Sequence, residues 1–178
     1  MKRIISVALA FILVALLTAC STGGYDSVSA QYIRTDGYHE DVVYPVVTVV
    51  RSVEKLTEYY HANKDRYYLE RRDQVYADSS IGFLDACDKY DAAYFEDQIL
   101  VLVLLQEGSG SIQHKVEDVK TDAEGKLSVS ISSIVPEIGT DDMAQWHIFI
   151  EPEAGVTVAG AEDVVVYLSR KMVEPIWR

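Results

Sequence analysis

Apolar and polar positions change their spacing part-way along the chain, and this change predicts two kinds of element. Between residues 52 and 97 the apolar residues recur mainly at intervals of three and four, which is typical of helices. From residue 98 onward they either run continuously or alternate with polar residues, which is typical of strands. We therefore predict an α+β fold with its helices early and its sheet late.

The early part of the chain predicts one strand and two helices. The stretch VVYPVVTVV (42–50) alternates as a strand does, and Pro45 near its start suits an edge. Ser52 suits the N-cap of a short helix, and Glu54 lies in its first turn. Residues 64–73 fit a helix end and an extended chain equally. The apolar positions of this first helix are Val53, Leu56 and Tyr60.

A second helix is predicted after Ser80, because one apolar stripe follows at helical spacing. The stripe consists of Phe83, Cys87, Tyr90 and Tyr94. The intervening carboxylates Asp85, Asp88 and Asp91 fall on the other face, where a solvated surface is expected rather than a calcium loop. This placement makes Cys87 a small core residue.

The late part of the chain predicts closely spaced strands. The run QILVLVLL (98–105) is continuously apolar, as expected of a strand covered on both faces. Alternation predicts further strands near 112–116 and over 127–135, 145–151 and 163–170. Short turns between them favour an antiparallel β-meander or sandwich, with one or two helices packed on it.

The N-terminus has the pattern of an export signal. Lys2 and Arg3 precede fourteen residues without a charge, too few for a comfortable transmembrane helix. The tetrapeptide LTAC (17–20) resembles the lipobox of bacterial lipoproteins, in which the cysteine sulfur is acylated and becomes the mature N-terminus. We therefore expect Cys20 to carry a lipid, with diacylglyceryl and palmitate-type chains supplying a stable anchor.

Three segments follow from this assignment. We expect a lipoprotein signal peptide over 1–19 and a lipid-anchored flexible tether over 20–40, where Ser, Gly and Asp are frequent and no apolar period is visible. Residues 41–178 are then a single globular α+β domain. The expected location is the cell membrane, with the domain lipid-anchored on its extracytoplasmic face.

Charge and cysteine content limit the partners and the chemistry. The formal net charge is −12, and removal of Lys2 and Arg3 with the signal would make it −14. Such a charge argues against nucleic acid and against electrostatic docking on anionic lipid. Once Cys20 is acylated, Cys87 is the only thiol left, so no intramolecular disulfide can form.

Candidate chemical sites each have a plainer explanation. The turn GSGS (108–111) could cradle an anion, but no lysine and helix follow it as in phosphate loops, so a hairpin is favoured. Cys87 could act as a nucleophile with His114 or His147, but a thiol on an apolar stripe is inert. The four histidines are too scattered for a zinc motif. We predict no catalytic activity, no cofactor and no metal.

Two aromatic regions could contact a protein partner. Strand periodicity places Trp146 with Ile148 and Ile150 on one face, and His147 with Phe149 on the other. One of these faces could be exposed to a partner, or both could be covered. The second region interleaves tyrosines with basic residues between 59 and 76, where the tyrosines could instead lie along the helix–sheet seam.

Two segments also resemble known families. The segment from Phe95 to Pro152 resembles the C-terminal domain of the protease-complex subunit PrcB, through YFED, GSGS, GKLSVSI, VPEIGT and WHIFIEP. Residues 67–91 running into 103–111 are similar to a group of uncharacterised lipoproteins from Gram-positive anaerobes. The PrcB resemblance implies a non-catalytic accessory domain that binds or stabilises another protein. Ser109-Gly110-Ser111-Ile112 departs from the Thr-Gly-Gly-Tyr-like turn of that family.

These observations predict a lipid-anchored, extracytoplasmic binding or accessory module that contacts another envelope protein. The alternative is a lipoprotein that binds a small ligand or an envelope polymer in a concave pocket. An enzyme is the weakest hypothesis. The expected partner contacts are Lys64, Arg66, Tyr67, Tyr68, Arg71, Arg72, Gly108, Ser109, Gly110, Ser111, Trp146 and His147.

Overall fold

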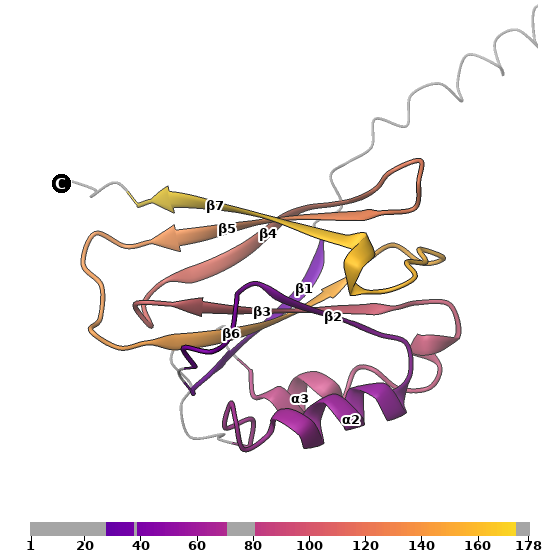
Figure 1. Cartoon of the computed structure of the whole chain (residues 1–178), viewed down its shortest axis with the longest axis horizontal. Coiled ribbons are helices and arrows are strands. Elements are labelled where there is room, and N and C mark those ends of the chain that lie inside the picture. The colour runs from indigo at the N-terminus through magenta and orange to yellow at the C-terminus, as the bar shows by residue number, and fades with distance from the viewer. Residues whose placement is uncertain (1–27, 38, 71–80, 174–178) are drawn as a thin grey trace, which may run out of the picture.

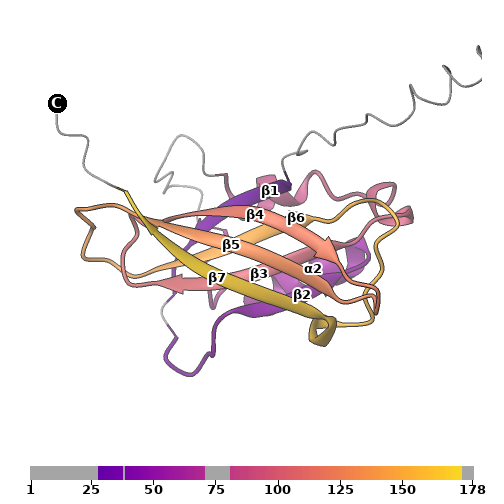
Figure 2. The ribbon, with the colours of Figure 1, turned by 90° about the horizontal axis from the view of Figure 1, so that it is seen from above.

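Two sheets and a helical layer form the part of the protein that can be described. The computed structural model describes residues 28–37, 39–70 and 81–173. A three-stranded sheet lies over a four-stranded sheet, and helices cover the far side of the latter (Figure 1). Seen from above, the three-stranded sheet overlies the four-stranded one (Figure 2). The predicted α+β sandwich with packed helices is confirmed.

The four-stranded sheet is antiparallel and mixes strands from distant parts of the chain. Its spatial order is β1, β6, β3 and β2. The strands are β1 (Ser29–Thr35), β2 (Val46–Val50), β3 (Leu100–Glu107) and β6 (Ala144–Glu151). All three pairings in this sheet are antiparallel. The strand predicted over 42–50 is observed only as β2, which begins directly after Pro45.

The three-stranded sheet departs from the predicted meander. Its strands are β4 (Gln113–Thr121), β5 (Leu127–Val135) and β7 (Val164–Met172), in that spatial order. β4 and β5 form an antiparallel hairpin, but β5 and β7 are parallel. The reason is that the chain leaves β5, runs back as β6 in the other sheet, and returns as β7 in the direction of β5. A purely antiparallel meander is thus wrong.

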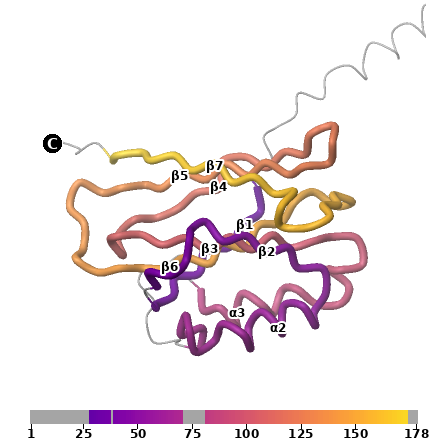
Figure 3. Tube along the Cα trace, in the orientation of Figure 1, coloured from indigo at the N-terminus to yellow at the C-terminus, as the bar shows by residue number. Residues whose placement is uncertain are grey.

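The helices form the third layer, which the tube in Figure 3 shows beneath the sheets. Helix α2 (Val53–Asn63) begins as predicted, since the Lys55 backbone N–H donates to Ser52 Oγ at 3.2 Å. Helix α3 (Phe83–Cys87) has only five residues, so the predicted stripe is helical only in part. Tyr94 instead starts a short 3₁₀ helix (Tyr94–Glu96), and a second one (Ala161–Asp163) precedes β7.

Two apolar clusters lie on opposite faces of the four-stranded sheet. Val101, Val103 and Leu105 of β3 face the three-stranded sheet, whereas Leu100, Leu102 and Leu104 face the helices. All six side chains are buried. The prediction that this strand is covered on both faces is confirmed.

Strand β1 lies inside the segment that was expected to be a flexible tether. It pairs with β6 from Ser29 opposite Glu151 to Thr35 opposite Gln145, and Ile33 is fully buried. The tether prediction is therefore wrong from Ser29 onward, and the globular domain begins before residue 41. Pairing with a distant strand stabilises β1, and no local pattern reports such pairing.

The expectations for residues 1–19 and for Cys20 lie outside the described residues. Within the described ranges, no helix is long and apolar enough to cross a membrane.

Candidate functional site

The turn at 108–111 carries the chain from β3 in the four-stranded sheet to β4 in the three-stranded sheet, so the predicted hairpin is wrong. A carboxylate from a distant part of the chain accepts hydrogen bonds from this turn. The Gly110 backbone N–H donates to Asp142 Oδ1 at 3.1 Å. Arg34 donates to Asp142 Oδ2 at 2.5 Å and to the Gly110 carbonyl at 3.2 Å. Hydrogen bonds from Thr140, from Gly110 and from Arg34 hold the pKa of Asp142 below its ordinary value. An external anion would have to displace this carboxylate.

Hydroxyl groups complete the same turn. Ser109 Oγ lies 2.9 Å from Ser111 Oγ and 3.2 Å from Thr140 Oγ1. Gly110 is buried, whereas Gly108 is exposed and Ser109 and Ser111 are half-buried. Of the four residues expected to contact a partner here, Gly110 is therefore covered, and the other three are at least partly accessible.

A second polar cluster is buried between the sheets, and the sequence did not single it out as a group. Ser133 Oγ donates to Glu107 Oε1 at 2.9 Å and lies 3.3 Å from His114 Nδ1. Arg170 donates to Glu107 Oε2 at 2.9 Å from a largely exposed position. Burial, and then the charge of Arg170, lower the pKa of His114 to about 4.

This cluster contains the residue types of a hydrolytic triad in a different arrangement. A triad places the histidine between the serine and the carboxylate, whereas here Ser133 lies between His114 and Glu107. Ser133 is also only 4% exposed. The cluster is therefore a buried hydrogen-bond network.

Trp146 and His147 lie on opposite faces of β6, as their alternation predicted. Trp146 packs in the cluster between the sheets, and Phe149 packs in the cluster under the helices. However, Trp146 is 6% exposed and His147 is fully buried. Their predicted role as partner contacts is wrong, because a layer covers each face of this sheet.

His147 lies in an aromatic environment beneath the helices. The rings of Tyr59, Tyr67 and Phe83 each meet it edge-on, with centroids 5.4 to 6.0 Å away. Its Nδ1 lies 3.0 Å from Thr35 Oγ1. Burial lowers the pKa of His147 to about 3, so the ring is neutral at ordinary pH.

The described part of the basic and tyrosine-rich region mixes exposed and buried side chains. Arg71, Arg72 and Tyr76 lie outside the described residues. Tyr67 is 3% exposed, so its predicted partner contact is wrong and its position in the helix–sheet seam is favoured. Arg66 pairs with Asp41 at 3.0 Å, and Lys64 lies 3.9 Å from Glu70. Tyr68 is 48% exposed and remains on the surface.

Cys87 is half-buried and packs against the cluster under the helices, as predicted. Burial, and then the nearby Asp88, raise the pKa of its thiol to about 12, so no reactive thiolate forms at neutral pH. Asp85, Asp88 and Asp91 are exposed, as expected of a solvated face. The part of the chain that the structure describes holds no group of three or more His, Cys, Asp or Glu arranged to bind a metal.

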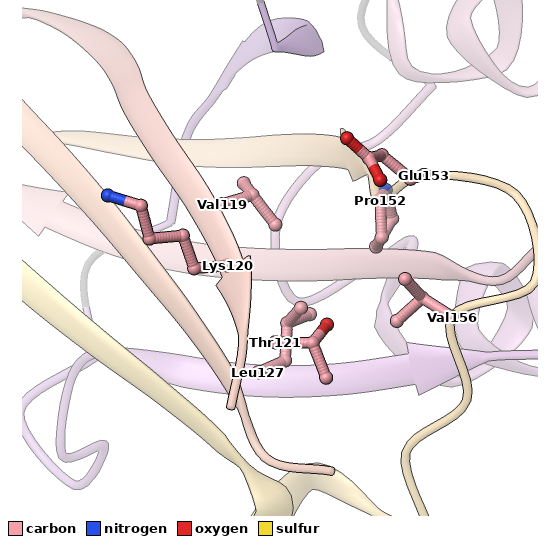
Figure 4. A pocket seen from close by; sticks show the side chains of 7 residues that line it. All are labelled: Val119, Lys120, Thr121, Leu127, Pro152, Glu153 and Val156. Atoms are coloured by element: carbon pink, nitrogen blue, oxygen red, sulfur yellow. The ribbon is translucent and has the colours of Figure 1, made fainter. Parts of the chain in front are cut away.

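A cleft of about 380 Å³ opens at the end of the sandwich that holds the β4–β5 hairpin (Figure 4). Val119, Leu127 and Val156 line it and belong to, or pack against, the core between the sheets. Lys120 and Glu153 stand apart at its rim, and the Lys120 ammonium lies 2.5 Å from Asp118. The cleft thus offers apolar contact with few convergent polar groups.

The last strand presents apolar side chains to solvent, and the sequence did not predict this exposure. Val165 is 39% exposed, Tyr167 58%, Leu168 50% and Met172 66%. We call these four residues the β7 edge. The apolar residues of DVVVYLSR fall on both faces of the strand, a pattern that favours a strand covered on both sides.

Comparison with protein-family models, with curated proteins and with solved structures finds no match to this chain. The resemblances to the PrcB domain and to the lipoproteins of anaerobes therefore remain predictions.

Proposed function

We propose that this protein is a non-catalytic accessory module that binds another envelope protein through the β7 edge. The observation that carries the proposal is the exposure of Val165, Tyr167, Leu168 and Met172 on one outer strand. Exposed apolar side chains gathered on one strand mark interaction sites, and tyrosine is enriched among residues that dominate binding. The strand pairs with β5 along all nine of its residues.

The proposal also includes a location for the protein, at the membrane. The tetrapeptide LTAC (17–20) supports acylation of Cys20, which would hold the domain on the extracytoplasmic face of the membrane. A net charge of −12 supports a covalent rather than an electrostatic link to that membrane.

One observation favours the alternative, a lipoprotein that binds a small ligand or an envelope polymer. The cleft in Figure 4 has the volume of a small-molecule site and an apolar floor. Its polar rim groups do not converge, so this function ranks second.

The proposal is tested by photo-crosslinking in the native envelope. A photoreactive phenylalanine analogue replaces Tyr167, and the matched control carries it at Gln113, an exposed residue of β4 in the same sheet. We expect one dominant envelope protein to be crosslinked from position 167 and not from 113. An added Val165→Asp substitution should abolish the product, and Cys20→Ala should release the domain from the membrane.

Equal, low yields of abundant proteins from both positions would refute binding at the β7 edge. In that case a ligand screen with Val119→Glu, which places a charge in the cleft, would test the second function.

A further inference from the structure

The two sheets end in four edge strands, and three of them carry features that discourage the addition of another strand. β4 has an irregular register between Val116 and Asp118 and a row of charged side chains. The β1 and β4 edges are joined across the sandwich, since the Val116 backbone N–H donates to the Tyr32 hydroxyl at 2.8 Å. β2 has only five residues and follows Pro45.

β7 differs from these three edges in combining nine residues, a regular register and an apolar first half. Among the described residues it pairs with β5 alone, and it is the terminal strand of its sheet. Its register is unbroken from Val164 opposite Leu127 to Met172 opposite Val135. It contains neither proline nor glycine, and it exposes Val165, Tyr167, Leu168 and Met172. A long, regular edge strand with exposed apolar residues is a template for β-strand addition.

We infer that β7 accepts an extended strand of the partner protein, which continues the three-stranded sheet. This inference rests on the proposed function and specifies how the partner binds. Main-chain hydrogen bonds along β7 would supply affinity, and alternate side chains of the added strand would meet Val165 and Tyr167 on the outer face.

The sequence of β7 argues against a second copy of this chain as the occupant. Its first half, Val164–Leu168, is apolar, and its second half carries Arg170 and Lys171. Two copies paired antiparallel about Leu168 would place Val165 opposite Lys171 and Val166 opposite Arg170, twice over. Two chains of net charge −12 would also repel each other.

A better fit is a partner strand that places an acidic residue opposite the basic half of β7 and apolar residues opposite its apolar half. Arg170 and Lys171 are 66% and 59% exposed, so both can also meet a partner's carboxylate beside their own partners Glu107 and Glu117. In an antiparallel pairing, the added strand would carry an acidic residue near its N-terminal end and alternating apolar residues after it.

The outer face beside β7 is suited to such a strand. Its charged residues are Lys115, Lys120 and Lys171 against Glu117 and Asp118, an excess of one positive charge on a chain of net charge −12. Lys115 and Lys171 pair with Glu117, and Lys120 pairs with Asp118. The acidic residues of the protein therefore do not repel the acidic N-terminal end of an added strand at this outer face.

The test is a selection from a phage-displayed library of linear nine-residue peptides on the full lipidated chain in detergent micelles. The variants are Tyr167→Lys on β7 and Gln113→Lys on β4, which add the same charge at opposite edges of one sheet. We expect enriched peptides to alternate apolar residues after an acidic one. Their affinity should fall at least about tenfold in Tyr167→Lys and stay unchanged in Gln113→Lys.

A second readout separates strand pairing from side-chain docking. Synthetic copies of the enriched peptides, N-methylated at either alternate set of amides, keep their side chains and lose main-chain donors. One of the two sets should weaken binding at least about tenfold, and the unmodified peptide should slow hydrogen exchange along β7.

The inference is overturned if no peptide is enriched over empty micelles, or if neither Tyr167→Lys nor N-methylation changes binding. A partner crosslinked at position 167 despite such a result would leave the proposed function standing, with docking through side chains instead. Absence of any crosslinked partner would refute the proposed function itself.

Discussion

The two sheets of this protein differ in how many of their faces the described residues cover. β3, in the four-stranded sheet, has its apolar residues buried on both faces. β5, in the three-stranded sheet, buries Leu127, Val129 and Ile131 and turns Ser128 and Ser130 outward. The continuous apolar run of β3 thus goes with two covering layers and the alternation of β5 with one, whereas the apolar run of β7 is largely exposed. The effect of a substitution on the free energy of unfolding should therefore depend more on the face that the side chain occupies than on the residue type.

The largest difference is expected between two aromatic residues. Phe149 is fully buried against the helices, so Phe149→Ala should lower the free energy of unfolding by about 3–5 kcal/mol. Tyr167 is 58% exposed, and Tyr167→Ala should change it by less than about 0.5 kcal/mol. Urea unfolding of both variants checks this. Similar losses for the two would mean that something covers the outer face of the three-stranded sheet.

Acidification should destabilise the protein through the two buried histidines, one on each face of the four-stranded sheet. The folded state lowers the pKa of His114 to about 4 and that of His147 to about 3, whereas an unfolded histidine has a pKa of about 6.5. The unfolded chain therefore binds more protons below pH 6.5, and stability falls as the pH falls. Each histidine should account for a loss of about 2 kcal/mol between pH 7 and pH 5.

The matched variant for this prediction is His147→Phe, which keeps a ring in the aromatic environment and removes only the contact with Thr35. The slope of unfolding free energy against pH, measured by urea titrations between pH 5 and 6, should decrease by about 1.4 kcal/mol per pH unit. An unchanged slope would show that His147 is not neutralised by burial.

A smaller difference is expected between two serines of β5. Ser133→Ala removes the donor to the buried Glu107 and the neighbour of His114, so it should cost about 1–3 kcal/mol. Ser130→Ala, on the outer face of the same strand, should cost less than about 0.5 kcal/mol. Thermal unfolding of the pair measures the difference. Equal effects would contradict the inward network between the sheets.

The fold was predictable where local periodicity reflects burial. β3, β5 and β6 were located from their apolar patterns, and Ser52 marked the start of α2. β1 was missed because only Ile33 of its seven residues is fully buried, and its pairing partner β6 lies more than 100 residues away. The parallel pairing of β5 with β7 was missed because it depends on β6 returning through the other sheet.

The candidate sites were less predictable, since they depend on which layers cover a strand. The alternation of Trp146 and His147 was read correctly, but their exposure was not, because helices more than 50 residues earlier cover one face. The filling of the 108–111 turn by Asp142 joins positions 32 residues apart. The open β7 edge is a property of the assembled sheet, which no single strand reports.

The early start of β1 also sets how far the domain can move from its proposed anchor. A tether from Cys20 to residue 40 could extend by about 70 Å, whereas the nine residue steps from Cys20 to Ser29 span at most about 30 Å. An acylated Cys20 would then confine the domain to a thin layer at the bilayer surface. Within that layer the local concentration of a membrane partner is high, so even a weakly binding partner strand would be paired with β7 much of the time.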